Sequence, residues 1–186
     1  MNPPASFEGD ERARLFCALR LPPEMVERIV AWQAEALAGA DARRVPGDHL
    51  HLTLAFLGHR PVAELEAILD ELRGAASAAV PARLSLQGYR ETRSVGMLTF
   101  DDEGGRAAAL AEDLHARLEA IGVYERERRR WLPHVTVLRF RQRPYLRPAL
   151  PELEPFAPSD AAAFLSRLRP GGAQYEVLES MEVGGR

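Results

Sequence analysis

Polar and apolar residues alternate strictly over residues 49–54, which is the period of a half-buried β-strand. The three leucines of this stretch then face a core, while His49, His51 and Thr53 share the opposite face. The strand is expected to end at Gly58. It therefore presents imidazoles and a hydroxyl side by side on its polar face.

The same small pattern recurs in residues 133–140, where His134 and Thr136 share one strand face and two valines share the other. The chain has five His and four Thr, and chance placement of these residues predicts about 0.1 His-x-Thr pairs. The sequence contains two such pairs, each followed by an aliphatic residue. Either strand alone is most simply an amphipathic strand with a histidine on its solvent-facing side. The repeat of the pattern favours a functional site.

The composition limits the partners and the chemistry of the chain. Its 186 residues suffice for one domain with a sizeable core, or for two small lobes that share one. A net charge of −3 argues against bulk-charge coating of nucleic acid, so an anion must meet a local patch. All 24 basic residues are Arg, which excludes Schiff-base lysines, phosphate-loop lysines and lysyl-nucleotidyl intermediates.

The single cysteine and the N-terminus indicate a compartment. Cys17 lies in an apolar run and forms no intrachain disulfide, so it is expected to be a core residue in a reducing compartment, with a catalytic role as the weaker reading. Residues 1–12 are expected to be a flexible leader and residues 13–186 a single domain. No signal peptide or membrane-spanning run is recognisable, so a cytoplasmic location is expected.

The order of expected elements favours an α+β fold over a doubly wound parallel sheet. Residues 161–168 are rich in alanine, which favours a helix, but the Pro-Gly-Gly that follows favours a terminal hairpin, and we expect the hairpin. Strands are expected at residues 14–21, 49–58, 83–89, 95–100, 133–140, 161–168 and 174–183, and helices at residues 24–38, 62–73 and 106–121.

Several segments carry charges or histidine outside these motifs. Residues 39–47, with Arg43 and Arg44, are expected to form a loop, and residues 142–159, with five prolines, to be irregular. His115 lies on the third expected helix and is expected to be a surface or boundary residue. A charged run precedes the second motif, and it either is solvated or lines the approach of an anionic substrate. Its basic residues are Arg126, Arg128, Arg129 and Arg130.

Two histidines that face each other across a cleft can move a phosphoryl group without a metal, because one imidazole accepts a proton while an imidazolium gives another. A Thr hydroxyl two residues on can donate to a phosphate oxygen. A strained 2′,3′-cyclic phosphodiester is a substrate that suits these imidazoles and hydroxyls. A metal site built from His49, His51 and His134 is the weaker alternative, because no acidic residue lies in residues 49–60.

The tandem motifs His51-Leu52-Thr53-Leu54 and His134-Val135-Thr136-Val137 resemble the two signatures of the 2H phosphoesterase superfamily. Residues 14–16, 18–19, 49–58, 133–134 and 166–175 resemble more specifically the RNA 2′,3′-cyclic phosphodiesterases, also called 2′-5′ RNA ligases. The resemblance covers nearly the whole chain after Arg12. It implies a bilobal α+β fold, with two antiparallel sheets and outer helices in a pseudo-twofold arrangement around a central cleft.

The resemblance also implies an activity and roles for particular residues. The family hydrolyses RNA 2′,3′-cyclic phosphate ends to 2′-phosphomonoesters without metal or cofactor, and in reverse joins 2′,3′-cyclic and 5′-hydroxyl ends by a 2′-5′ bond without ATP. By motif position, His51 is the proton donor, His134 the proton acceptor, and Thr53 and Thr136 the phosphate-binding residues. Arg139 keeps its family position as a phosphate contact, although Val137 and Leu138 depart from the usual residues before it.

The implied partners are RNA ends that bear a 2′,3′-cyclic phosphate, among them tRNA fragments, with the protein acting as a monomer. Spacing alone does not assign the acid and the base, because the two motifs are nearly symmetric. Two alternative functions remain open. One is a non-catalytic module that binds cyclic-phosphate or 2′-5′-linked RNA. The other is a phosphodiesterase acting on small cyclic nucleotides or on 2′-5′ oligoadenylate.

Overall fold

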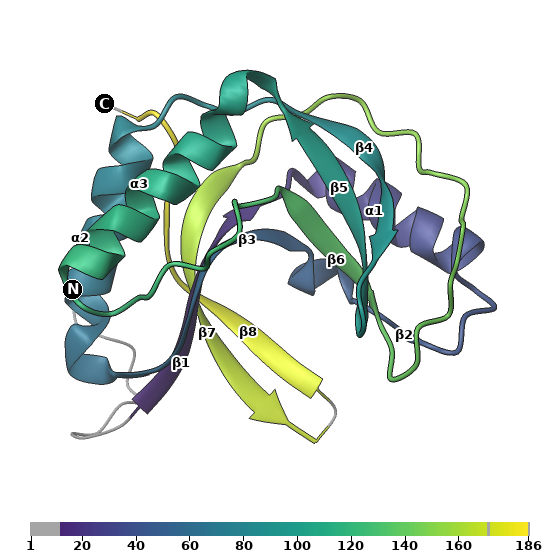
Figure 1. Cartoon of the computed structure of the whole chain (residues 1–186), viewed down its shortest axis with the longest axis horizontal. Helices are drawn as coiled ribbons and strands as arrows, with labels where there is room; N and C mark the ends of the chain where they lie inside the picture. Colours follow the sequence, from purple (N-terminus) through teal and green to yellow (C-terminus); the bar gives the residue numbers. More distant parts are fainter. Residues whose placement is uncertain (1–11, 171, 186) are drawn as a thin grey trace.

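The computed structural model describes residues 12–170 and 172–185, which form two antiparallel four-stranded sheets and three α-helices (Figure 1). The strand order is β3-β1-β7-β8 in the first sheet and β2-β6-β5-β4 in the second. The first sheet consists of β1 (Arg12–Arg20), β3 (His51–Pro61), β7 (Asp160–Arg169) and β8 (Gly172–Met181). The second consists of β2 (Arg43–Arg44), β4 (Leu84–Glu91), β5 (Val95–Asp102) and β6 (His134–Arg139).

The expected α+β class with two antiparallel sheets is confirmed. The first motif begins at the start of β3 and the second at the start of β6, so each sheet carries one motif. Apart from the two-residue β2, each motif strand is outermost in its sheet, and β3 contacts β6. This placement agrees with the pseudo-twofold arrangement that the resemblance implies.

The helices α1 (Pro23–Ala36), α2 (Leu65–Ala78) and α3 (Arg106–Ala120) lie on the outer faces of the sheets (Figure 1). α2 and α3 lie side by side and pack on the first sheet, against β7 and β3. α1 begins with a proline, which suits the first helical position, and packs beside the second sheet. There the Gln33 side chain donates to the carbonyl oxygens of Val45 and Val137, at 3.0 and 2.7 Å. In the part of the chain that the structure describes, no helix has the length and apolarity that a membrane crossing requires.

Two predicted boundaries are wrong. Arg12, expected in the leader, is the first residue of β1 and pairs with Pro61, while the rest of the leader lies outside the described residues. β3 begins at His51, whereas His49 closes a short 3-10 turn at Gly47–His49. Alternation alone extends the strand back to His49, but hydrogen bonds of the turn hold the backbone there. His49 therefore reaches the polar face from a turn and not from the strand.

The expected loop over residues 39–47 contains a short strand, which corrects a third prediction. Arg43 pairs with Arg139 and Arg44 with Leu138, so β2 is held against the second motif strand. A strand of two residues has no period to detect, so the sequence pattern could not indicate it. The consequence is that a basic pair is placed beside the second motif.

The terminal hairpin is confirmed, since β7 and β8 pair from Ala161↔Met181 to Arg169↔Gly172. Alanines on β7 are buried in the sheet interior, where small side chains fit. Residues 142–159 are irregular as expected, apart from one bridge between Leu84 and Phe156.

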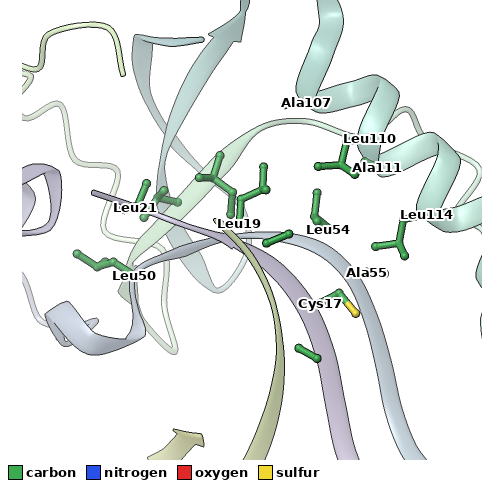
Figure 2. Close-up of a cluster of buried hydrophobic side chains, with 14 of the residues drawn as sticks. Cys17, Leu19, Leu21, Leu50, Leu54, Ala55, Ala107, Leu110, Ala111 and Leu114 are labelled. Atoms are coloured by element: carbon green, nitrogen blue, oxygen red, sulfur yellow. The ribbon is translucent and has the colours of Figure 1, made fainter. Parts of the chain in front are cut away.

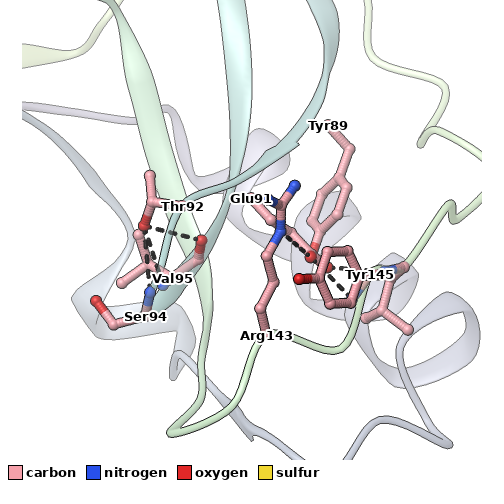
Figure 3. A network of polar contacts seen from close by, with 8 residues as sticks. Tyr89, Glu91, Thr92, Ser94, Val95, Arg143 and Tyr145 are labelled. Atoms are coloured by element: carbon pink, nitrogen blue, oxygen red, sulfur yellow. Dashed lines mark hydrogen bonds and ion pairs between the residues drawn. The ribbon is translucent and has the colours of Figure 1, made fainter.

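A buried carboxylate fastens the start of this irregular segment (Figure 3). Glu91, at the end of β4, accepts hydrogen bonds from the Tyr89 hydroxyl, the Arg143 Nε and the backbone N–H groups of Tyr145 and Leu146, all at 2.9–3.1 Å. These four donors satisfy a charge that would be costly to bury alone. The irregular segment is therefore tied to the second sheet by specific contacts.

One hydrophobic core continues through both sheets and beneath all three helices. Figure 2 shows part of it, where Cys17 and Leu54 face Leu110 and Leu114 of α3. Cys17 is fully buried, and burial raises the pKa of its thiol to about 12, so it is a core residue and not a nucleophile. The two sheets and the three helices thus share one core, while the single domain over residues 13–186 stays a prediction.

Candidate active site

The strand that carries the first motif contains two β-bulges. In its register with β1, Cys17 pairs with Ala55 and Ala18 with Thr53, so Leu54 is an extra residue on β3. A second shift follows at Leu57. Bulges bend a strand and re-aim its side chains, and they are frequent beside active sites.

Two side chains from outside the first sheet hold the bulged strand. His115 of α3 places Nε2 at 2.8 Å from the carbonyl oxygen of Leu54. The indole N–H of Trp131 donates to the carbonyl oxygen of Thr53, also at 2.8 Å. The first contact fixes the bulge, and the second joins the strand to the segment that enters β6.

The prediction that His115 is a surface or boundary residue is wrong, because its side chain is buried against Tyr124. The signal for burial was present in the sequence, since Ala111 and Leu118, four residues before and three after, lie on the buried stripe of the same helix. A satisfied hydrogen bond to Leu54 makes this burial possible.

A cavity of about 280 Å³ lies between the two sheets, and both motifs line it. It is lined by all five residues that were predicted from the sequence to take part in the reaction, namely His51, Thr53, His134, Thr136 and Arg139. We refer to this cavity as the cleft. The structure thus brings together side chains from β3 and β6, which are far apart in the sequence.

The cleft also contains residues to which sequence patterns assigned no part in the reaction. Arg14 reaches it from β1, Arg43 from β2, Tyr175 from β8, and His49 from the turn before β3. The imidazole of His49 lies against the ring of Tyr175, with centroids 4.3 Å apart. Only tertiary pairing brings Arg14, Arg43 and Tyr175 to the motifs, so no local pattern could reveal them, whereas the alternation in the sequence already placed His49 on the motif face.

The two motif histidines are oriented alike. Nδ1 of His51 lies 2.8 Å from the carbonyl oxygen of His49, and Nδ1 of His134 lies 2.8 Å from that of Leu132. A carbonyl oxygen only accepts, so Nδ1 carries the hydrogen in each ring and Nε2 is left for proton transfer. In His51, Nε2 lies 3.1 Å from the Thr53 hydroxyl oxygen.

The surroundings of His51 are mostly aromatic. Its ring stacks on Phe16, with centroids 4.9 Å apart, and the ring of Phe164 lies 5.9 Å away. Burial is the main cause that lowers the pKa of His51 to about 4. The nearby positive charges of Arg139 and of the other cleft histidines act in the same direction, and the His49 carbonyl opposes them. In the free protein at neutral pH, His51 is therefore uncharged.

The chain has a net negative charge, so the binding of an anion requires local positive charge. Arginines supply this charge at the cleft. Arg14, Arg43 and Arg139 line the cleft from both sheets. Arg14 is held by a hydrogen bond from Nη1 to the Ser166 hydroxyl oxygen at 2.6 Å. Arginine suits phosphate recognition, because its planar guanidinium donates several hydrogen bonds at once.

The charged run before the second motif does not line the cleft. Arg126 pairs with Glu112 and Glu119, and Arg129 pairs with Glu127. These contacts agree with the solvated reading of the run. The alternative, in which it lines the substrate approach, finds no support in this arrangement.

A metal site of three histidines is not formed by the residues described. Within residues 12–170 and 172–185, no group of three or more His, Cys, Asp or Glu side chains is arranged to hold a metal ion. His49, His51 and His134 all reach the cleft, but they do not meet as a set of ligands. The groups that the cleft offers for chemistry are imidazoles, hydroxyls and guanidiniums.

Two sheets that present paired His and Thr residues at one cleft have the architecture expected of a 2H phosphoesterase. The family model of the 2′-5′ RNA ligase superfamily matches residues 21–169. The chain is 33% identical to an RNA 2′,3′-cyclic phosphodiesterase of Thermus thermophilus, over 92% of this chain and 91% of that protein. It is 32% identical to an RNA 2′,3′-cyclic phosphodiesterase of Escherichia coli, over 69% and 73% of the two chains.

Solved structures agree with this assignment. The crystal structure of TT0787 of Thermus thermophilus aligns with a TM-score of 0.77 at 32% identity, over 92% of this chain and 98% of that one. Escherichia coli LigT complexed with 3′-AMP aligns with a TM-score of 0.76 at 26% identity, over 94% and 99%. The chain belongs to the 2′-5′ RNA ligase superfamily.

Proposed function

We propose that this protein is an RNA 2′,3′-cyclic phosphodiesterase, which hydrolyses cyclic phosphate ends to 2′-phosphomonoesters. The observation that carries the proposal is the meeting of both His-x-Thr motifs in one cleft, with each imidazole oriented by the same Nδ1 contact. Arginines at the same cleft supply charge for a phosphate. The names of the Thermus and Escherichia relatives agree with this activity.

In the proposed reaction, His134 takes a proton from a water molecule, and the water oxygen attacks phosphorus. The bond between phosphorus and the 3′-oxygen breaks, and the imidazolium of His51 protonates that oxygen. The hydroxyls of Thr53 and Thr136 donate to the non-bridging oxygens, and Arg139 balances their charge. The product is a 2′-phosphomonoester with a free 3′-hydroxyl. No step needs a metal ion.

The proton donor must be charged, although His51 is neutral in the free protein at pH 7 because burial holds its pKa at about 4. A cyclic phosphate brings one negative charge into the cleft, and an anion in contact with an imidazole raises its pKa. We therefore assign the donor role to His51 in the substrate complex.

The same geometry supports the reverse reaction. A 5′-hydroxyl that replaces water attacks the cyclic phosphate, the 3′-oxygen leaves, and a 2′-5′ phosphodiester forms. The energy of the strained ring replaces that of ATP. We propose hydrolysis as the main reaction because water is always in excess.

The proposed substrates are RNA ends with a 2′,3′-cyclic phosphate, tRNA fragments among them. We propose that the protein acts as a monomer, since the residues of both motifs come from one chain. A cytoplasmic location is consistent with a single buried cysteine, which needs no oxidising compartment.

The test is the hydrolysis of a short oligoribonucleotide with a 2′,3′-cyclic phosphate in the presence of EDTA. We expect a 2′-phosphate end, identified by phosphorus NMR, and no such product with His134→Ala. Recovery of intact substrate after tight binding identifies a binding module instead. A 3′-phosphate product, or turnover that EDTA abolishes, contradicts the proposed mechanism.

A further inference from the structure

A row of aromatic side chains crosses the first sheet beside His51. Phe16 of β1 pairs with Phe56 of β3 on one side and with Phe164 of β7 on the other. Directly opposed residues in an antiparallel sheet project to the same face. The ring of Phe16 stacks on His51, so this face is the one that carries the first motif.

Phe56 differs from the other two rings of the row in its exposure. Phe16 and Phe164 are buried, at 3% and 5%, whereas Phe56 is 50% exposed. The bulge at Leu54 explains its position. In a regular strand Ala55 would follow Thr53 on the motif face, but the extra residue moves Phe56 there instead.

Arg14 connects this exposed ring to the cleft. Its guanidinium carbon lies 4.7 Å from the centroid of Phe56, and the same side chain lines the cleft with His51. The hydrogen bond to Ser166 keeps Arg14 between the two. A ligand that extends from the cleft past Arg14 therefore meets an aromatic surface next.

An exposed ring next to a guanidinium is suited to one chemical class of ligand. Unstacked bases of single-stranded RNA stack on aromatic rings and guanidinium planes, while Arg contacts the phosphates between them. The positive charge of Arg14, Arg43 and Arg139 complements such a chain. Four rings near the first motif belong to the first sheet, namely Phe16, Phe56, Phe164 and Tyr175, so the nucleosides are expected on that side.

We propose that Phe56 and Arg14 form a subsite for the nucleotide that precedes the cyclic-phosphate end. The base of this nucleotide stacks on Phe56, and Arg14 contacts the phosphate that links the two nucleotides. The proposal rests on the proposed function. A subsite of this kind makes the protein select RNA ends over free cyclic mononucleotides.

The test compares two substrates, 2′,3′-cyclic AMP and a tri-adenylate with a 2′,3′-cyclic phosphate end. We expect Phe56→Leu to lower kcat/KM for the trinucleotide about tenfold, the effect of losing one base stack, and for the mononucleotide less than about twofold. Phe56→Tyr keeps an aromatic ring and should retain activity on both. Urea unfolding checks that the variants fold.

The chain offers a matched control in Tyr145. The guanidinium carbon of Arg143 lies 4.7 Å from its ring centroid, the same separation as in the Phe56 pair, and Tyr145 does not line the cleft. Tyr145→Leu removes this exposed ring but keeps its backbone hydrogen bond to Glu91. We expect it to leave both substrates unaffected.

The outcomes separate this proposal from the proposed function. Equal losses on both substrates, or no loss on the trinucleotide, overturn the subsite. If the unmodified protein hydrolyses neither substrate, the proposed function fails, and calorimetric titration with the trinucleotide then decides the subsite. A roughly tenfold weaker binding of Phe56→Leu supports the subsite, and unchanged binding overturns it.

Discussion

Nδ1 of His51 and Nδ1 of His134 each lie 2.8 Å from the carbonyl oxygen of the residue two positions earlier in the chain. The backbone thus fixes the tautomer of both rings in the same way, although the rings belong to different sheets. A hydrogen bond at Nδ1 also sets the orientation of the ring, and the orientation decides where Nε2 can transfer a proton. The repeat of one local geometry at two sites leaves Nε2 of each ring to take part in proton transfer at the cleft.

Removing either imidazole should remove the activity. We expect His51→Ala and His134→Ala each to lower kcat on a cyclic phosphate at least about 10²-fold, the usual contribution of a positioned acid or base. His59→Ala is the matched control, because His59 lies exposed on the same strand as His51 and does not line the cleft. Activity retained by either cleft variant contradicts the two-histidine mechanism.

A substrate with sulfur in place of the leaving 3′-oxygen should separate the donor from the acceptor. A thiolate leaves without a proton, so it no longer needs an acid. We expect this substrate to restore much of the rate of His51→Ala and little of that of His134→Ala, as measured by initial rates of cyclic ring opening. The opposite pattern of rescue would reverse the two roles.

The threonine hydroxyls should act on the transition state more than on binding. We expect Thr53→Val and Thr136→Val to lower kcat about 10²-fold, since each removes a donor to a developing phosphate charge. Thr→Ser at either position keeps the hydroxyl and should stay within a few fold of the unmodified protein. A change confined to KM in the valine variants argues instead for simple substrate binding.

The low pKa of His51 has a consequence for stability. An unfolded histidine protonates near pH 6.5, whereas His51 in the folded protein has a pKa of about 4, so the unfolded state binds more protons between these values. The free energy of unfolding should therefore decrease as the pH falls from about 6.5 to about 4, by about 3 kcal/mol from this group.

Urea unfolding at about pH 7, 5 and 4 measures this effect. His51→Gln has no imidazole at this position, so its stability should depend less on pH than that of the unmodified protein by about the same amount. Identical pH dependences of the two proteins would mean that His51 titrates normally in the folded state.

The hydrogen bond of His115 should support the bulge beneath the first motif. His115→Phe leaves the carbonyl oxygen of Leu54 without this donor, and we expect a loss of about 1–3 kcal/mol in the free energy of unfolding. His115→Gln keeps a donor and should lose less. Equal stability of the phenylalanine variant and the unmodified protein would show that water replaces the imidazole.

The sequence predicted the parts of the site that a strand period can reveal. His51 and Thr53, like His134 and Thr136, lie two positions apart on a strand, so the alternation itself places each pair on one face. The terminal hairpin was predicted for a similar reason, because turn residues outweighed the helical preference of alanine. Local sequence patterns were sufficient to predict features formed by residues that are close together in the sequence.

The rest of the site depends on contacts that no local pattern contains. Arg14, Arg43 and Tyr175 reach the cleft through strand pairing across the chain, and the bulge at Leu54 becomes visible only in the register with β1. His115 lies on an apolar stripe, but the backbone oxygen that accepts its hydrogen bond, and so allows its burial, cannot be identified from the sequence. That oxygen belongs to Leu54, the extra residue of the bulge.

The indole hydrogen bond between Trp131 and Thr53 has a mechanical consequence. Trp131 precedes His134 by three residues, so this bond links the two motifs that line the cleft. This bond adds to the contacts between β3 and β6 and to the shared core, which together hold the distance that a phosphate must bridge. Loss of the indole would leave both half-sites intact, with their spacing held by packing alone.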